Sequence, residues 1–348
     1  MTGEGMNVGA PLTDARSPGD EPLKDAWQWT MSQFEFPTIN RAYNCVFRQD
    51  RLSVGLVVPI ENYATNPVPQ MQRHIERVQL AEQLGFSAVW IRDVPFNVPS
   101  FGDAGQTFDP FVYLGCLASC TQEIALGVAS IILPLRHPAH VAKAAATADV
   151  LSGGRLILGV ASGDRPEEYP ALNVPYGDRG VRFRDSFDYI RSVTEGPSRF
   201  SSSFGTVGES IEMLPRPTGC RLPLLITGGS QQNPQWLASH GDGRMLYPRP
   251  AAMQQPFIQQ WREQLRSAGR SDQPILEPLY IDLVANPDAV PTPIHLGFRL
   301  GVNSLVEYLR ARREIGVNHI ALNLRFNQAD IEDTLQQLAA SVLPEFHS

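Results

Sequence analysis

The sequence predicts a (β/α)8 barrel, and three observations lead to that prediction. Eight short apolar runs alternate with helical patterns between residues 51 and 343, which is the element count of this fold. Several helical patterns start with proline, and glycine turns join helices to the next apolar run. One complete unit is visible at 151–164, where a helix end, a glycine turn, a buried strand and a polar loop follow one another.

An open, doubly wound parallel sheet is the alternative architecture. That fold normally carries a Gly-x-Gly-x-x-Gly turn after its first strand, where it binds a dinucleotide. No such turn follows the first apolar run of this chain. The barrel is therefore the preferred interpretation, with insertions after the fourth and seventh strands.

The barrel is expected to be a single domain over 51–348, preceded by two different segments. Residues 1–26 are rich in Gly, Pro, Asp and Glu, a composition typical of a disordered tail. Residues 27–50 form an aromatic N-terminal extension, which we expect to pack on the barrel or on a second subunit. Its aromatic residues are Trp27, Trp29, Phe34, Phe36, Tyr43 and Phe47.

The first half of the barrel pattern has well-marked element ends. Asp109 and His137 each precede a proline, as expected for an N-cap followed by proline at the first helical position. Gly85 fits the position just after a helix end. Strands are expected at 53–59, 88–91, 124–129 and within 151–164, and helices at 70–84, 110–120 and 138–151.

The second half of the pattern is interrupted twice. A Pro- and Gly-rich loop at 164–180 and a helix at 181–193 precede an insertion at 196–220, where we expect a hairpin of 206–208 with 211–214. A second Pro-rich loop is expected after the seventh strand. The remaining strands are expected at 223–227, 243–247, 275–284 and 319–323, the loop at 285–299, and the remaining helices from Pro234 and at 254–268, 304–315 and 331–343.

Composition and charge narrow the class of protein. The formal net charge is −7 and no basic run is present, so nucleic acid is not an expected partner. None of the four cysteines forms a Cys-x-x-Cys pair, and no apolar run approaches the ~20 residues that span a bilayer. With no secretion signal in view, we expect a cytoplasmic protein without a membrane partner. The seven histidines show no metal-ligand spacing with an acidic third residue, so no metal is expected.

The functional residues of a (β/α)8 barrel lie at the carboxyl ends of its strands. After the fifth strand the chain reads Thr-Gly-Gly-Ser-Gln-Gln and runs into a capped helix. Free backbone N–H groups, glycines that permit close approach and a serine hydroxyl favour a phosphate here. A plain glycine-rich turn is the alternative. The residues expected to contact the phosphate are Gly228, Gly229, Ser230 and Gln231.

Ser162, Gly163 and Asp164 form a second polar turn, directly after the fourth strand. Backbone and hydroxyl groups at this turn suit the same ligand. Because neighbouring loops commonly share a phosphate on barrels, the two turns support one another. The alternative is a simple loop with a solvated Asp164.

Two charged pairs lie at the ends of the second and third strands. Arg92 and Asp93 are interpreted mainly as a local ion pair that braces the rim of the barrel. Arg136 and His137 allow two interpretations. Either His137 caps a helix and Arg136 pairs with a surface carboxylate, or the two place a cation at the barrel mouth near an anionic substrate or flavin.

Four stretches of the chain carry a family resemblance. They read AEQLGFSAVW at 81–90, IALGVAS at 124–130 followed by LRHP at 135–138, LSGGRLILGVASG at 151–163, and PLLITGGS at 223–230. In this order they resemble the bacterial luciferase-like flavin monooxygenases, a (β/α)8 family. The likeness extends over about residues 51–343.

The resemblance implies a flavin, as FMN or its deazaflavin relative, at the carboxyl-end mouth of the barrel. It implies a non-prolyl cis peptide bond near Ala129–Ser130, forming a bulge under the flavin ring, and a phosphate against the turn at 228–230. The expected cofactor contacts are Pro59, Ala129, Ser130, Ser162, Gly163, Gly228, Gly229, Ser230 and Gln231, and the expected catalytic residues are Asp93, Arg136 and His137.

This chain departs from the family at one position that matters for chemistry. Many members carry a histidine just after the acidic residue that ends the second strand, but here Val94 follows Asp93. The usual acid–base candidate is therefore missing. The segment 94–106, with two phenylalanines and two prolines, is expected to shape the substrate pocket.

The function that the resemblance implies is a monooxygenase that uses reduced FMN and oxygen to oxidise a small organic substrate. A flavin reductase would supply the reduced FMN, and a homodimer is expected. Two alternatives stay open. One is a deazaflavin-dependent reductase or dehydrogenase on the same fold, and the other is a flavin-binding protein without enzymatic activity.

Overall fold

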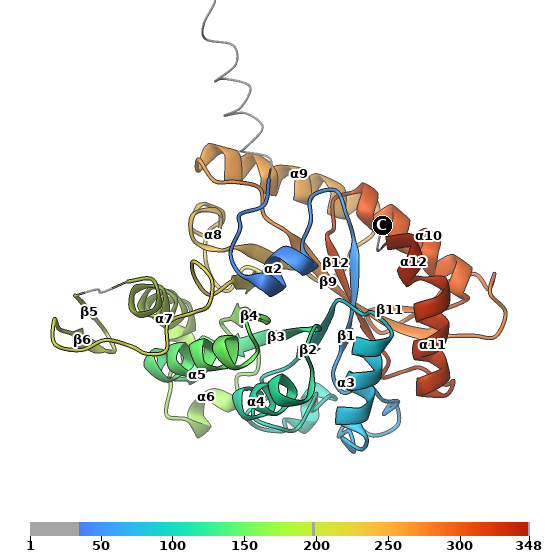
Figure 1. Ribbon diagram of the computed structural model, residues 1–348, viewed down its shortest axis with the longest axis horizontal. Helices are drawn as coiled ribbons and strands as arrows, with labels where there is room; N and C mark the ends of the chain where they lie inside the picture. Colours follow the sequence, from blue (N-terminus) through green and yellow to red (C-terminus); the bar gives the residue numbers. More distant parts are fainter. Residues whose placement is uncertain (1–34, 197–198, 347–348) are drawn as a thin grey trace, which may run out of the picture.

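The computed structural model describes residues 35–196 and 199–346. The expected tail at 1–26 and the first part of the aromatic extension lie outside the described residues. The rest of the chain forms the barrel drawn in Figure 1, with a ring of strands inside a layer of helices.

Eight parallel strands close the predicted barrel. Each strand pairs with the next along the chain, and the last, β12, pairs in parallel with the first, β1. The (β/α)8 prediction is thereby confirmed. The barrel strands are β1 (Ser53–Val57), β2 (Ala88–Ile91), β3 (Ala125–Ile132), β4 (Leu156–Ala161), β7 (Leu224–Thr227), β8 (Gly243–Met245), β9 (Ile275–Leu283) and β12 (His319–Asn323).

The outer layer contains one main helix after each strand. Asp109, Asn233 and Asp330 are N-caps whose side chains accept backbone N–H groups of the following helix. The helices are α3 (His74–Gln83), α4 (Pro110–Cys120), α5 (Pro138–Leu151), α7 (Arg179–Thr194), α8 (Pro234–His240), α9 (Ala251–Ser267), α10 (Val302–Glu314) and α11 (Ile331–Ser341), with the short α6 (Glu168–Ala171) and α12 (Leu343–Phe346).

The structure corrects two expectations about the insertions. The first hairpin pairs β5 (Phe200–Ser202) with β6 (Gly205–Val207), and the segment 211–214 is not a strand. The loop expected at 285–299 contains a second hairpin, β10 (Thr292–Ile294) with β11 (Gly297–Leu300). In the second case β11 also pairs with β9, so a long-range partner supplies hydrogen bonds that local sequence does not reveal.

Two apolar clusters lie on the two sides of the strand ring. Successive side chains of a strand point to opposite faces, so Leu56 packs under the helices while Val57 points into the barrel. The inner cluster contains Trp90, whose Nε1 donates to His319 Nε2 at 2.8 Å. Burial lowers the pKa of His319 to about 3, so its imidazole is neutral and can accept this bond.

The helix α2 (Arg41–Val46) closes the amino end of the barrel, where Figure 1 shows it in blue over the strand ring. Tyr43 and Phe47 belong to the inner cluster. The Asn40 amide caps α2 and donates to the Leu156 carbonyl at 2.8 Å, at the start of β4. The described part of the extension, residues 35–50, therefore packs against the barrel, which is the first of the two roles expected for the extension.

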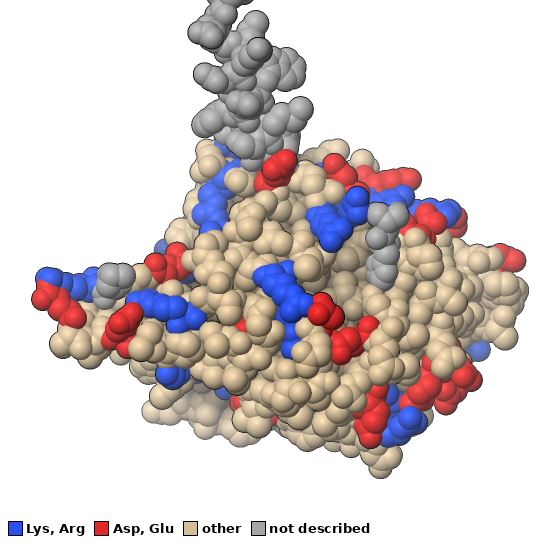
Figure 2. Space-filling view, in the orientation of Figure 1, with Lys and Arg blue, Asp and Glu red and all other residues tan. Residues whose placement is uncertain are grey.

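The surface carries scattered charges of both signs on the face shown in Figure 2, and no broad basic area is visible there. None of the helices that the structure describes is both long and apolar enough to cross a membrane.

Candidate functional site

Two adjoining cavities open at the carboxyl ends of the barrel strands. The larger has a volume of about 410 Å³ and reaches the floor formed by β1, β9 and β12, while the smaller, of about 290 Å³, extends to the loops after β4 and β7. Six residues line both, so the two cavities adjoin and a single ligand can extend through them. The shared residues are Arg92, Phe101, Ala129, Ser130, Thr227 and Tyr247.

The turn after β7 forms one end of the smaller cavity, which Gly228, Gly229, Ser230 and Gln231 all line. Gly228, Ser230 and Gln231 have positive φ angles of 54°, 42° and 59°, a conformation that turns successive backbone N–H groups to one side. A Cβ atom added at Gly228 or Gly229 would meet no atom within 4 Å. The space in front of the turn is therefore open.

Arg244 lies behind this turn as a buried cation. Its side chain is only slightly exposed and donates from Nη2 to the Gly228 carbonyl at 2.7 Å. No carboxylate pairs with it among residues 35–196 and 199–346, and burial lowers the pKa of its guanidinium to about 10. Because the C=O and the next N–H of a trans peptide point in opposite directions, this bond directs the Gly229 N–H away from Arg244.

The turn after β4 borders the same cavity through Ser162, Gly163 and Asp164. The Ser162 carbonyl accepts a hydrogen bond from the Tyr169 hydroxyl. Gly163 has a φ of 77°, and a Cβ there would lie 2.7 Å from Ile132 and from Tyr169, so glycine is required by space as well as by conformation. The structure thus brings together the two turns that the sequence paired.

The end of β3 forms the wall between the two turns. Ala129–Ser130 is a non-prolyl cis peptide bond, which confirms the geometry implied by the family resemblance. The pairing of β3 with β4 shifts register between Val128 and Ile131, so a bulge is present. The Ser130 hydroxyl bonds the Thr227 hydroxyl, which joins the bulge to the end of β7.

The ion pairs at the rim differ from those expected. Arg92 and Asp93 do not pair with each other, because adjacent residues of an extended segment point to opposite sides. Asp93 instead binds Arg136 through both oxygens, at 2.7 and 3.0 Å. It also accepts the backbone N–H of Ile132 at 3.1 Å. Arg92 turns the other way and donates to Asp103 at 2.8 Å.

Three predicted site residues do not line either cavity. Pro59 is buried after a cis bond to Val58. Arg136 binds Asp93 and Asp109. His137 is exposed and caps α5 by accepting the Ala139 N–H at its Nδ1 atom, 3.2 Å away. The catalytic roles of these side chains stay predictions, whereas Asp93, Ala129, Ser130, both glycine turns and Gln231 line the smaller cavity.

Two buried charged residues of the smaller cavity were not predicted from the sequence. Arg165 and Glu168 lie in a segment expected to be a loop, yet Glu168 begins the short helix α6. Its Oε1 atom has no hydrogen-bond partner in the described part of the chain. Burial raises the pKa of Glu168 to about 7. The sequence signal was a proline followed by two glutamates, which is a typical helix start.

Comparison with known proteins gives one family and several relatives. A family model described as luciferase-like monooxygenase matches residues 52–289. A Mycobacterium tuberculosis protein of uncharacterised function is 30% identical over 236 residues, which cover 63% of this chain and 82% of that protein. The oxygenase component of a flavin-dependent trigonelline monooxygenase from Acinetobacter baylyi is 30% identical over 169 residues, or 47% of this chain and 42% of that protein.

Among solved structures, an F420-dependent secondary alcohol dehydrogenase in complex with an F420-acetone adduct is similar to this chain. The two share a TM-score of 0.71 and 17% identity, and the match covers 86% of this chain and 100% of the dehydrogenase chain. At this level of identity the likeness concerns the fold.

Proposed function

The chain belongs to the luciferase-like monooxygenase family and is an oxidoreductase, and we propose on that basis that it is a flavin-dependent monooxygenase. In the proposed reaction, reduced FMN and oxygen oxidise a small organic substrate. When bound, the flavin supplies the redox chemistry, and the protein supplies orientation and a dry site.

The observation that supports this proposal most is the continuous double cavity, which has a polar end and an apolar end. The polar end offers backbone N–H groups of the turn after β7, with open space in front of Gly228 and Gly229. The apolar end is floored by Val57, Leu276 and Ala321. A flavin mononucleotide has the matching shape, with a phosphate at one end and a planar ring at the other.

The phosphate is proposed to bind at Gly228, Gly229, Ser230 and Gln231, next to Ser162 and Gly163. The helix α8 contributes little here, because it has seven residues and its N-cap Asn233 already accepts the Trp236 N–H. Arg244 supports the site from behind through the Gly228 carbonyl. Its buried positive charge gains a counter-ion when a phosphate binds.

The ring is proposed to lie against Ala129 and Ser130 at the end of β3. Asp93 and Arg136 are proposed to position this wall in place of the catalytic roles expected for them, because Asp93 holds the Ile132 N–H at 3.1 Å. Neither Arg136 nor His137 lines the cavities, and we assign His137 a capping role only.

A deazaflavin-dependent hydride transfer is the second candidate function. It is favoured by the structural likeness to an F420-dependent secondary alcohol dehydrogenase. The relative from Acinetobacter is named as an oxygenase component, which supports a separate reductase as partner of a monooxygenase. A cytoplasmic location and a homodimer stay predictions.

The test is a binding comparison of FMN, riboflavin and F420 on the purified full chain, in oxidised and reduced form. We expect FMN to bind more tightly than riboflavin because of its phosphate. Gly229→Asp places a negative charge in the open space in front of the turn and should weaken FMN binding about tenfold or more. Gly229→Ala is the matched control and should leave FMN affinity nearly unchanged.

The outcomes separate the candidates. Binding of reduced FMN, with oxygen uptake that needs a reductase, supports the monooxygenase. Exclusive binding of F420 supports hydride transfer, and tight flavin binding without any turnover supports a non-enzymatic binding protein. Failure of all three cofactors to bind contradicts the proposal.

A further inference from the structure

Two arginines and one carboxylate meet at the rim of the larger cavity. Arg92, which follows β2, donates from Nη1 to Asp103 Oδ2 at 2.8 Å. Arg325, which follows β12, places Nη1 3.1 Å from the same oxygen and donates from Nη2 to the Gly102 carbonyl at 2.7 Å. All three charged side chains line the cavity.

The group carries one surplus positive charge. Asp103 is the only carboxylate that lines the larger cavity among the residues described. Burial opposes its ionisation, but Arg92 and the Gly105 N–H outweigh that effect and lower the pKa of Asp103. One ionised carboxylate therefore faces two guanidinium groups, which stay protonated at all ordinary pH values.

Both arginines have donors left over. In the described part of the chain, Arg92 makes one recorded side-chain hydrogen bond, through Nη1. Arg325 is 8% exposed, and its Nε atom is buried without a partner. A buried donor without an acceptor is unfavourable, and an uncompensated charge is more so. An anionic group on a ligand would accept from the remaining donors of Arg92 and compensate the surplus charge.

The surroundings of this charge are aromatic. Phe101, Tyr247, Tyr280 and Phe326 line the same cavity, and the Arg325 guanidinium lies 5.3 Å from the centre of the Phe326 ring. The floor below is apolar. The cavity thus suits a ligand with an apolar or aromatic body and one negative charge at its edge.

We propose that the rim of the larger cavity, above the floor where the flavin ring is proposed to lie, binds an organic substrate that carries a carboxylate on an aromatic or other apolar body, with the carboxylate held by Arg92 and Arg325. This inference rests on the proposed function, whose substrate it specifies by class. Planar guanidinium groups bind carboxylates through paired hydrogen bonds. Asp103 fixes the two arginines in place and leaves one positive charge for the substrate.

The test uses pairs of probes that differ only in charge. Benzoate with benzamide, and phenylacetate with phenylacetamide, are titrated into the full chain by calorimetry, with and without FMN. We expect each carboxylate to bind at least about tenfold more tightly than its amide. A tenfold difference in Kd is about 1.4 kcal/mol of binding free energy. Equal affinities within each pair, or no binding by any carboxylate, overturns the proposal.

Variants at position 325 locate the effect. Arg325→Met should remove the preference for carboxylates and leave benzamide affinity unchanged, whereas Arg325→Lys should restore part of the preference because the charge returns. Arg299→Met, on the exposed face of β11, is the control and should have no effect. Thermal melting of each variant checks that the barrel is folded.

FMN affinity, measured on the same variants, separates this inference from the proposed function. Arg325→Met should bind oxidised and reduced FMN as the parent does. If it weakens reduced FMN and leaves benzoate unchanged, the surplus charge serves the cofactor and the proposal is overturned. If no flavin binds but benzoate is still preferred over benzamide, the proposed function fails and the carboxylate site stands.

Discussion

At the scale of single residues, Arg244 and Glu168 are buried ionisable groups that have no hydrogen bond to an opposite charge in the described part of the chain. Among the residues described, the Arg244 side chain hydrogen-bonds only a backbone carbonyl and stacks over the Trp261 ring, and one oxygen of Glu168 has no hydrogen-bond partner. Such groups reduce stability unless a ligand or a proton compensates them. Their positions beside and behind the smaller cavity give each a measurable consequence.

Replacement of Arg244 by Met should reduce the discrimination between FMN and riboflavin. The variant loses the bond that directs the Gly229 N–H to the phosphate, and we expect FMN affinity to fall about tenfold while riboflavin affinity stays constant. Equilibrium fluorescence titration of both ligands measures the ratio. Arg266→Met, an exposed arginine of α9, is the control. An unchanged ratio in Arg244→Met would contradict the role.

The Glu168 carboxyl should make stability fall as pH rises. Burial raises its pKa to about 7 in the folded state, whereas the unfolded carboxyl titrates near its ordinary value of about 4.3. The folded state therefore binds more protons between these values, and its advantage is lost as pH passes through about 7. Between about pH 5 and about pH 8, urea unfolding should show the parent losing on the order of 1–3 kcal/mol relative to Glu168→Gln. Parallel pH profiles would refute this assignment.

The sequence predicts site residues where a local pattern determines them, and misses those that depend on distant partners. The turn at 227–232 is recognisable because glycine and a capped helix start follow a strand. The pairing of Arg92 with Asp103 was not predicted, because the intervening loop folds back on itself. Arg325 follows β12 more than 200 residues further along the chain, and its approach to Asp103 follows from barrel closure.

At the scale of elements, glycines in two strands leave room for large side chains inside the barrel. Gly127 in β3 faces the Trp90 ring of β2, and an added Cβ would lie 2.2 Å from a ring carbon. Gly55 in β1 faces His319 in the same way, at 2.8 Å. The glycines therefore provide the space that the Trp90–His319 pair occupies.

Gly127→Ala should destabilise the protein because the Trp90 ring must move within a packed interior. We expect a loss of about 1–3 kcal/mol or more in the free energy of unfolding, with a change in tryptophan fluorescence. Gly115→Ala, in α4, is the matched control, since a Cβ there meets open space. In that helix the change should stabilise by up to about 1 kcal/mol. Equal stability of the two variants would disprove that Gly127 provides the space for the Trp90 ring.

Helix ends were predicted well and inserted hairpins were not. Asp109, His137 and Asn233 are N-caps in the structure as expected, because capping depends on a few adjacent residues. The strand β11 depends on β9 for its hydrogen bonds. The sequence of 285–299 does not predict that pairing, because Pro287, Pro291 and Pro293 indicate a loop.

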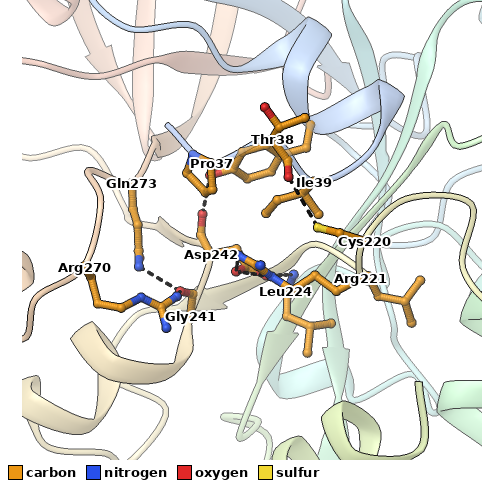
Figure 3. Close-up of polar contacts among 12 residues, drawn as sticks. Pro37, Thr38, Ile39, Cys220, Arg221, Leu224, Gly241, Asp242, Arg270 and Gln273 are labelled. Atoms are coloured by element: carbon orange, nitrogen blue, oxygen red, sulfur yellow. Dashed lines mark hydrogen bonds and ion pairs between the residues drawn. The ribbon is translucent and has the colours of Figure 1, made fainter. Parts of the chain in front are cut away.

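At the scale of the whole molecule, the amino end of the barrel is held by a network around Asp242. Its carboxylate binds Arg191 and Arg221 and accepts the Leu224 N–H at 2.9 Å, and its backbone carbonyl accepts the Tyr43 hydroxyl at 2.7 Å. Figure 3 shows Asp242 beside Arg221, with Thr38 and Cys220 meeting nearby. The network joins α2, α7 and the strands β7 and β8.

Asp242→Asn should be among the most damaging substitutions outside the cavities. Burial opposes ionisation of Asp242, but Arg191 and Arg221 outweigh it and lower the pKa of the carboxyl. Its loss leaves Arg221 without its carboxylate partner and Arg191 with only the more exposed Glu195, and breaking a buried pair in this way costs about 3–5 kcal/mol. Chemical denaturation measures the change, and the exposed Asp188→Asn serves as control. A loss below about 1 kcal/mol would show that the network is dispensable.

The architecture as a whole was predictable because eight repeated units are an unusually strong pattern. The closing of the barrel by α2 was not, because the aromatic segment alone allowed packing on the barrel or on a second subunit. What decides the matter is Asn40, whose amide reaches Asp149 and the start of β4. Such contacts, 109 and 116 residues apart, are set by the completed fold.

The position of the α2 helix has a consequence for how ligands reach the cavities. Side chains of the inner cluster fill the barrel interior and α2 covers its amino end, so the two adjoining cavities are reached from the opposite, carboxyl-end rim. The flavin and the substrate that we propose to bind there would therefore both enter from this rim. With the flavin ring proposed at the floor and the substrate at the rim, we expect an ordered mechanism in which the flavin binds before the substrate and leaves after the product.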